Sequence, residues 1–354
     1  MKKTSVFLFV FCITLLANAK ACKNIVFTFY NPVVLRSAID SATAIDPPVA
    51  ISGSGATYTQ ITANWNTSVG ATTYHLDVST SIGFANFVTG FNNYNAGNVT
   101  SCVVTGLFSC TAYYYRVRAE NTCNTSVNSN IISYSTLDPC GGIPTITDID
   151  GNVYNTVCLG TQCWMKENLK TGTLIPISTH QTNNGILEKY CYNNDIAHCD
   201  SSGAIYQWAE AMQYKDGCSN TASLQPTPAV KGICPTGWHI PVVAEWNTLT
   251  TYLGGESVAG GKMKVTPICG TKPCWKTPNS GATNSSGFSA FSSGESYNEG
   301  SSGFANNSYY ANYWTSTESL ATAGRAYRMD YNNTQCAMNS KYKTSGLSIR
   351  CVKD

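Results

Sequence analysis

The stretch Leu107-Phe-Ser-Cys-Thr-Ala-Tyr-Tyr-Tyr-Arg-Val-Arg-Ala119 alternates apolar and polar side chains, which is typical of a half-buried β-strand. Alternate residues form its two faces: Tyr113, Tyr115, Val117 and Ala119 on one, and Tyr114, Arg116 and Arg118 on the other. Residues 61–65 and 74–78 alternate in the same way, and turn residues separate such runs. Residues 46–138 are therefore predicted to form an all-β sandwich.

Leu107 and Tyr113 resemble the tyrosine corner of Ig-like sandwiches. On this basis residues 46–138 resemble a fibronectin type III domain. A late hairpin with Arg-Gly-Asp would indicate an integrin-type ligand, but this loop reads Asn121-Thr-Cys-Asn124. The resemblance therefore implies a spacer domain more than a binding module.

Residues 1–21 have the features of a signal peptide. Lys2-Lys3 precede the apolar run Val6–Leu16, and small residues follow at Ala17, Ala19 and Ala21. The run is short for a membrane span, which needs roughly 20 apolar residues. We expect export to the outer cell surface or medium, with a retained N-terminal anchor as the alternative. Residues 22–45 are predicted to be a linker that includes a strand near Asn24–Tyr30.

The 16 cysteines fit an oxidising compartment. No Cys-x-x-Cys pair occurs, and the histidines at positions 75, 180, 198 and 239 lack metal-ligand spacing, so we predict disulfides and neither metal nor cofactor. Removal of Cys12 with the signal peptide leaves an odd number of cysteines. The simplest hypothesis is that Cys22 is the cysteine without a disulfide partner. Cys22 stands at the position where a lipoprotein carries diacylglycerol. Whether Cys22 is lipidated stays open.

The net charge of +2 and the charged fraction of 12% argue against nucleic acid and against electrostatic docking to membranes. Polarity comes mainly from Ser, Thr, Asn and Gly. Such a surface suits extracellular carbohydrate or a surface protein as partner, with membrane contact only through an N-terminal lipid.

The second predicted domain, residues 139–354, contains several separated motifs. They are Gly160-Thr-Gln-Cys-Trp-Met-Lys-Glu-Asn-Leu169, Gly203-Ala-Ile-Tyr-Gln-Trp208, Gly232-Ile-Cys-Pro-Thr-Gly-Trp-His-Ile-Pro241, Ser286-Gly-Phe-Ser-Ala290, Tyr313-Trp-Thr-Ser-Thr317 and Gly346-Leu-Ser-Ile-Arg-Cys-Val352. In order and spacing they resemble the Fibrobacter succinogenes major paralogous domain. This resemblance implies an exported protein and carries no established biochemical activity.

Gly-Trp-His-Ile-Pro, the following Glu-Trp and the terminal Ser-Ile-Arg-Cys-Val also resemble the C-type lectin and formylglycine-generating-enzyme scaffold. That scaffold implies a disulfide-rich α+β domain. Apolar periodicity predicts helices near 205–212 and 242–253, the second without a polar N-cap at Val242. No Glu-Pro-Asn, Gln-Pro-Asp or Trp-Asn-Asp occurs, so a calcium-dependent sugar site is not expected. Likewise, Asp150-Gly151 predicts a β-hairpin turn within 145–157 in preference to a calcium loop.

Sequence proximity suggests the disulfide pairs, although connectivity cannot be deduced from sequence. The suggested pairs are Cys158–Cys163, Cys191–Cys199, Cys218–Cys234, Cys269–Cys274 and Cys336–Cys351. Two further bridges would involve Cys102, Cys110, Cys123 and Cys140, in or beside the sandwich.

The common hydrolase and nucleotide-binding motifs are absent, so we expect a non-catalytic binding or adhesion protein. The candidate binding residues lie in the loop-rich region of the second domain: Trp275, Tyr309, Tyr310, Tyr313 and Trp314. Their aromatic faces suit sugar rings or a protein partner. Core packing is the alternative for them, and for Trp314 it is the favoured interpretation. A structural subunit of a surface assembly and a paired-carboxylate glycosidase are the remaining hypotheses.

Overall fold

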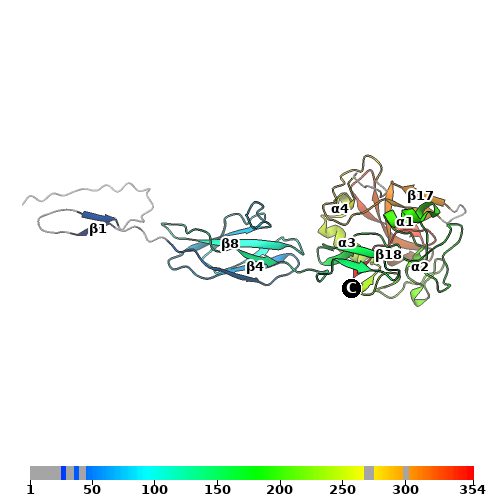
Figure 1. Cartoon of the computed structure of the whole chain (residues 1–354), viewed down its shortest axis with the longest axis horizontal. Helices are drawn as coiled ribbons and strands as arrows, with labels where there is room; N and C mark the ends of the chain where they lie inside the picture. Colours follow the sequence, from blue (N-terminus) through cyan, green and yellow to red (C-terminus); the bar gives the residue numbers. More distant parts are fainter. Residues whose placement is uncertain (1–24, 29–35, 40–44, 267–274, 298–302) are drawn as a thin grey trace, which may run out of the picture. The chain divides into compact units, whose positions relative to one another are not determined.

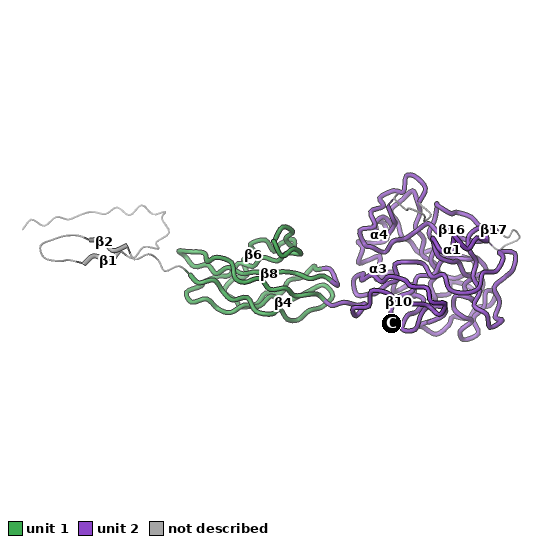
Figure 2. The backbone as a smooth tube through the Cα atoms, viewed as in Figure 1, with its two compact units in different colours: residues 1–107, 111–136 green, residues 108–110, 137–354 purple. Residues whose placement is uncertain are grey.

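The computed structural model describes residues 25–28, 36–39, 45–266, 275–297 and 303–354 (Figure 1). The predicted signal peptide, Cys22 and the suggested Cys269–Cys274 pair lie outside these ranges. The chain forms two compact units (Figure 2). The first contains Met1–Leu107 and Thr111–Thr136, and the second contains Phe108–Cys110 and Leu137–Asp354. In the predicted linker, strand β1 (Ile25–Thr28) pairs antiparallel with β2 (Arg36–Ile39).

Besides the β1–β2 pair, the first unit contains two sheets, with strand orders β3-β4-β7 and β6-β5-β8-β9. Their bounds are β3 (Ala50–Ser54), β4 (Gln60–Trp65), β5 (Thr73–Ser79), β6 (Tyr94–Gly97), β7 (Ser101–Thr105), β8 (Ala112–Glu120) and β9 (Ile132–Ser135). The alternation predicted for β8 is confirmed, because its odd-numbered residues from Tyr113 to Ala119 are buried and the even-numbered ones are partly exposed. On the outer face, Arg116 and Arg118 both pair with the buried carboxylate of Asp77, at 2.9 and 3.2 Å.

The first sheet of the second unit has the order β10-β11-β12-β21-β15. These strands are β10 (Thr145–Thr147), β11 (Val153–Leu159), β12 (Gln162–Met165), β15 (Trp238–His239) and β21 (Val352–Lys353). The predicted hairpin is confirmed, since β10 pairs antiparallel with β11 and Gly151 takes a φ of 83° in the turn. The carboxylate of Asp148 accepts hydrogen bonds from Asn152 N at 2.9 Å and Tyr154 Oη at 2.6 Å. The Asp148 carboxylate thus holds the turn together through hydrogen bonds within the hairpin.

The second sheet of this unit has the order β17-β16-β18-β19-β20, and β13 (Thr173–Leu174) pairs separately and in parallel with β14 (Glu188–Lys189). Its strands are β16 (Ser293–Tyr297), β17 (Gly303–Asn307), β18 (Tyr310–Leu320), β19 (Ala323–Asp330) and β20 (Cys336–Tyr342). Both faces of central strand β18 are covered, because Trp314 packs in one hydrophobic cluster and Tyr313 in another.

The helices are α1 (Ile196–Ser202), α2 (Trp208–Ala211), α3 (Val243–Tyr252) and α4 (Glu256–Met263), with short 3₁₀ helices at Tyr192–Asn194 and Lys215–Gly217. Helix α3 confirms the second predicted helix, with Trp246 and Leu249 buried. Glu245 compensates for the missing polar cap by accepting from Val242 N at 2.9 Å. The first predicted helix is shorter than expected, because Ile205 forms a β-bridge with Tyr190. No helix within the described ranges is long and apolar enough to span a bilayer.

The separated motifs of the second unit meet around one buried arginine. Arg350 is fully buried, and its guanidinium donates to Asn168 Oδ1 and to the backbone oxygens of Met165 and Phe288. It also lies over the Phe288 ring, 4.3 Å from the centroid, and over Tyr313 at 5.5 Å. These residues come from four different sequence motifs and pack together in the interior. The motifs therefore specify the folded scaffold. We call Asn168, Phe288, Tyr313 and Arg350 the Arg350 core.

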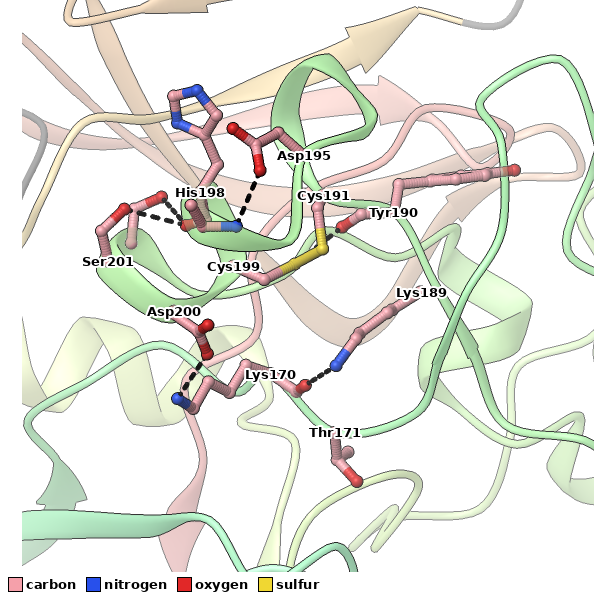
Figure 3. Close-up of a disulfide and its surroundings, with 12 residues drawn as sticks. Lys170, Thr171, Lys189, Tyr190, Cys191, Asp195, His198, Cys199, Asp200 and Ser201 are labelled. Carbon is pink, nitrogen blue, oxygen red and sulfur yellow. Dashed lines mark hydrogen bonds and ion pairs between the residues drawn. A yellow bond between two sulfur atoms is a disulfide. The ribbon is translucent and has the colours of Figure 1, made fainter.

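The disulfides differ from most of the suggested pairs. Cys191–Cys199 is confirmed and closes the loop before α1 (Figure 3). The pairings Cys158–Cys163, Cys218–Cys234 and Cys336–Cys351 are wrong: the structure forms Cys110–Cys158, Cys140–Cys163 and Cys234–Cys351.

Tertiary packing explains each correction. Strand β21 lies between β12 and β15, which brings Cys351 to Cys234 across a sequence separation of 117 residues. Cys218 and Cys336 are consequently left as buried thiols. The two extra bridges suggested among Cys102, Cys110, Cys123 and Cys140 do not form as such, because Cys110 and Cys140 bond within the second unit and Cys102 is a free thiol. Cys123 is itself disulfide-bonded.

Candidate functional site

A group of partly exposed tyrosines gathers where β18 begins and β19 ends. It consists of Tyr309, Tyr310 and Tyr331 together with the cationic residues Lys276 and Arg328. We call these five residues the tyrosine surface. Lys276 is exposed, and the other four are partly exposed.

Backbone geometry brings these residues together. The turn from β17 to β18 places Asn306 and Ser308 at positive φ, 62° and 73°, and Tyr309 N donates to Asn306 O at 3.0 Å. In the β18–β19 register Tyr310 lies opposite Asp330. Tyr331 N consequently donates to Tyr309 O at 3.0 Å, and Lys276 N donates to Ser308 O at 2.8 Å.

The aromatic rings contact one another in one edge-to-face pair and one tilted pair. Tyr309 and Tyr331 have centroids 5.3 Å apart with a T-shaped arrangement, and Tyr309 and Tyr310 are 6.3 Å apart. Such pairs stabilise by about 0.5 to 1.5 kcal/mol beyond their buried area. The rings are therefore held in place without a ligand.

Two cations pack on these rings. Lys276 Nζ lies 4.3 Å from the Tyr309 centroid and 5.9 Å from that of Tyr331, and it donates to Tyr309 Oη at 2.6 Å. The same hydrogen bond raises the pKa of Lys276, so its ammonium stays charged. Arg328 Cζ lies 3.6 Å from the Tyr310 centroid, while its Nε pairs with Asp330.

A buried carboxylate supports the turn beside this surface. Glu295 on β16 is almost fully buried, and its Oε1 accepts from Tyr297 Oη at 2.8 Å and from Asn306 Nδ2 at 2.7 Å. Its Oε2 accepts from Lys341 Nζ at 2.5 Å and from Asn312 Nδ2 at 3.2 Å. Burial and the Glu295 carboxylate raise the pKa of Tyr297 to about 12. Glu295 is thus engaged within the chain and acts as an anchor for the turn.

The predicted binding residues separate into two groups. Tyr309 and Tyr310 are partly exposed and belong to the tyrosine surface, so their role in binding stays a prediction. Tyr313 and Trp314 are fully buried, and Trp275 is 6% exposed with its Nε1 donating to Ala290 O at 2.9 Å. These three are corrected to core residues, because β18 is a central strand and Trp275 packs in the same hydrophobic cluster as Tyr313.

Sequence reasoning missed Lys276 and Tyr331. Both reach the tyrosine surface through pairings distant in sequence, Lys276 to Ser308 and Tyr331 to Tyr309. Knowledge of the β18–β19 register would have indicated Tyr331, since it follows the residue opposite Tyr310. No local pattern marks Lys276.

A small polar cavity of about 240 Å³ lies beside the Cys191–Cys199 loop. Figure 3 shows Lys170 paired with Asp200 at 3.0 Å, and Lys189 Nζ donating to Lys170 O at 2.5 Å. Asp195 caps α1 by accepting from Ala197 N at 3.0 Å. Burial lowers the pKa of Lys189, and nearby carboxylates oppose that effect. Of the charged residues that line this cavity, Lys170 and Asp200 pair with each other, and Glu167 accepts from Asn155 N at 2.8 Å.

A larger groove of about 850 Å³ is lined by several loops, including 146–150, 185–187 and 231–236. Its acidic groups also have partners. Asp148 is bonded as described above, and Asp150 accepts from Thr171 Oγ1 at 2.8 Å and from Gly172 N at 2.6 Å. These hydrogen bonds lower the pKa of Asp150. The groove presents the exposed side chains of Ile149, Ile186 and Lys231.

Two further groups of titratable residues are held in bonds within the protein. Cys110, Asp138 and Cys158 lie close enough together to hold a metal ion, but the two sulfurs are joined in a disulfide and are not thiolate ligands. Glu188 and Glu210 meet in the interior, where Glu188 N donates to Glu210 Oε1 at 2.9 Å. Burial raises the pKa of Glu210.

Comparison with solved structures gives partial likenesses to proteins with fibronectin type III or titin domains. The chain is 21% identical to titin kinase with its flanking domains, covering 26% of this chain and 17% of that one with a TM-score of 0.22. It is 20% identical to the protein described as FN3tt mut, covering 27% and 100% with a TM-score of 0.23. The fibronectin type III domain of human fibronectin type III domain containing protein 3 gives 19% identity, 29% and 95% coverage and a TM-score of 0.24.

No curated protein sequence matches the chain. The family model of the Fibrobacter succinogenes major domain matches residues 157–353, which is more than half of the chain. This range includes the whole Arg350 core and the tyrosine surface. The chain belongs to the Fibrobacter succinogenes major domain family.

Proposed function

We propose that the protein is an exported, non-catalytic binding or adhesion protein, and that the tyrosine surface contacts carbohydrate. The observation that carries the proposal is the set of pre-positioned, partly exposed rings of Tyr309, Tyr310 and Tyr331. Sugar rings present C–H groups on their faces, which pack well against aromatic rings. Because the rings are ordered without ligand, binding costs little side-chain entropy.

The compartment and the architecture support this proposal. The signal-peptide features of residues 1–21 and the disulfides fit an oxidising environment outside the cytoplasm. We further infer that the second unit has a lectin-like or formylglycine-generating-enzyme-like scaffold, with the last strand β21 placed between β12 and β15. The first unit would then act as a fibronectin type III-like spacer.

The proposal is tested on an array of extended glycans with the full chain and a double variant, Tyr309→Ala/Tyr310→Ala. Tyr94→Ala is the matched control, because Tyr94 is a 41% exposed tyrosine of the first unit. We expect the double variant to weaken binding by about tenfold or more, as loss of aromatic anchors does at other interfaces. The control should bind like the natural protein.

Far-ultraviolet circular dichroism and thermal unfolding establish that both variants are folded. Absence of binding to every polysaccharide by the natural protein would contradict the carbohydrate proposal and favour a protein partner. Equal binding by the natural protein and the double variant would place the site elsewhere, with the groove lined by Ile149 and Ile186 as the next region to mutate.

A further inference from the structure

We infer that the tyrosine surface selects acidic polysaccharide, a sugar chain that carries carboxylate or sulfate groups. This inference rests on the carbohydrate-binding role proposed above and adds the charge class of the ligand. It follows from the difference between the two cations of the surface.

Lys276 carries an uncompensated charge. Within the described residues its ammonium forms no salt bridge, and its hydrogen-bond partner is the neutral Tyr309 hydroxyl. That hydroxyl raises the pKa of Lys276, so the charge persists through neutral and mildly alkaline pH. The ammonium is also held at a fixed place over Tyr309 and Tyr331.

The other charges near the surface are either paired or buried: Lys264 is fully buried, and its ammonium donates to backbone oxygens that include Asp330 O at 2.8 Å. Arg328 pairs with Asp330, and Lys341 pairs with the buried carboxylate of Glu295. One positive charge thus remains on the tyrosine surface, and it belongs to Lys276. A ligand with complementary charge is negative.

The same residues favour a sugar over an acidic peptide. The hydrogen bond and the cation–π contact put the positive charge beside the face of a ring, at Tyr309. A uronate or sulfated sugar presents a flat C–H face and an acidic group on one rigid ring. It can therefore contact the exposed part of the tyrosine rings and reach the Lys276 ammonium without folding a flexible chain. A glutamate side chain has the charge without the ring.

The experiment compares charged and uncharged forms of the same polymer against the full chain by titration calorimetry. The probes are polygalacturonate and its methyl ester, dextran sulfate and dextran, and polyglutamate as a charged polymer without sugar. The variants are Lys276→Gln and Lys276→Arg. Lys262→Gln is the control, since Lys262 is an exposed lysine on α4 whose ammonium donates to Leu253 O.

We expect the natural protein to bind at least one acidic polysaccharide more tightly than its neutral form. Lys276→Gln should reduce that preference by about 3- to 10-fold at low salt, whereas Lys276→Arg and Lys262→Gln should retain it. Added salt should reduce the preference as well, because the charge is exposed.

Three results would overturn the inference. If the charged and neutral forms of a polysaccharide bind equally through Tyr309 and Tyr310, the inference that the surface selects acidic sugars is wrong. The carbohydrate-binding proposal then stands. If polyglutamate binds as tightly as the acidic polysaccharides with the same dependence on Lys276, the ligand is an acidic protein. If none of the polysaccharides binds, charged or neutral, the carbohydrate-binding proposal fails together with this inference.

Discussion

Arg350 and Lys276 are both cations of the second unit, but their surroundings are opposite. The guanidinium of Arg350 is fully buried and is bonded to an amide oxygen and backbone oxygens of the same chain. The ammonium of Lys276 belongs to an exposed residue and has a phenol hydroxyl as its hydrogen-bond partner. The Arg350 guanidinium is thus fully engaged by groups of the same fold, whereas the Lys276 ammonium is exposed and its hydrogen-bond partner carries no charge. Strong sequence motifs mark the first region and do not mark the second.

We expect the largest loss of stability from a substitution in the Arg350 core. Arg350→Ala removes the donors for Asn168 and for three backbone oxygens, those of Met165, Phe288 and Ser289, and leaves a cavity next to Phe288. We expect the free energy of unfolding to fall by about 3 to 5 kcal/mol. Urea unfolding followed by tryptophan fluorescence measures it. A loss below about 1 kcal/mol would contradict a central role for this arginine.

The Cys234–Cys351 disulfide is the next most sensitive feature, because it ties the last strand to a segment 117 residues away. Replacing both cysteines by serine should cost about 2 to 5 kcal/mol. Cys218→Ser is the matched control, since Cys218 is a buried free thiol. Peptide mapping without reduction checks the pairing directly. Recovery of a Cys218–Cys234 peptide would show that the corrected connectivity is mistaken.

His239, a residue of the Gly-Trp-His-Ile-Pro motif, should make a smaller contribution to stability, and this contribution should depend on pH. Burial acts to lower its pKa, but hydrogen bonds with Glu245 at 2.8 Å and Asp354 at 2.6 Å outweigh burial, so the pKa is raised. The protonated ring therefore stabilises the fold below the ordinary histidine pKa of about 6.5, and this stabilisation is lost as pH rises through the raised value.

His239→Gln removes this titration. The difference in unfolding free energy between the natural protein and the variant should be largest in mildly acidic solution and decrease toward alkaline pH. Unfolding curves across that range measure it. A difference that stays constant or grows with pH would contradict the assignment of the carboxylate contacts to His239.

Local patterns of residues were sufficient to predict elements that depend only on residues close together in the sequence. The alternation of β8, the turn at Gly151 and the buried stripe of α3 were all predictable, because each depends on neighbouring residues. The disulfides were not, since Cys351 meets Cys234 only after β21 has entered the sheet between β12 and β15.

The candidate site was predictable in part. Aromatic density between residues 309 and 314 indicated the region, but it could not separate Tyr310 from Tyr313 and Trp314. That separation depends on β18 being a central strand that is covered on both faces beyond its first residues. Lys276 came from a segment with no motif, because its position is set by a backbone contact with Ser308.

The central claim is that binding and folding use different residues of the same unit. It is tested most directly by measuring polysaccharide binding and urea unfolding on one variant, Tyr309→Ala/Tyr310→Ala. The account predicts loss of binding with a decrease in unfolding free energy below about 2 kcal/mol, because both side chains are partly exposed. Retained binding, or loss of binding only through global unfolding, would contradict it.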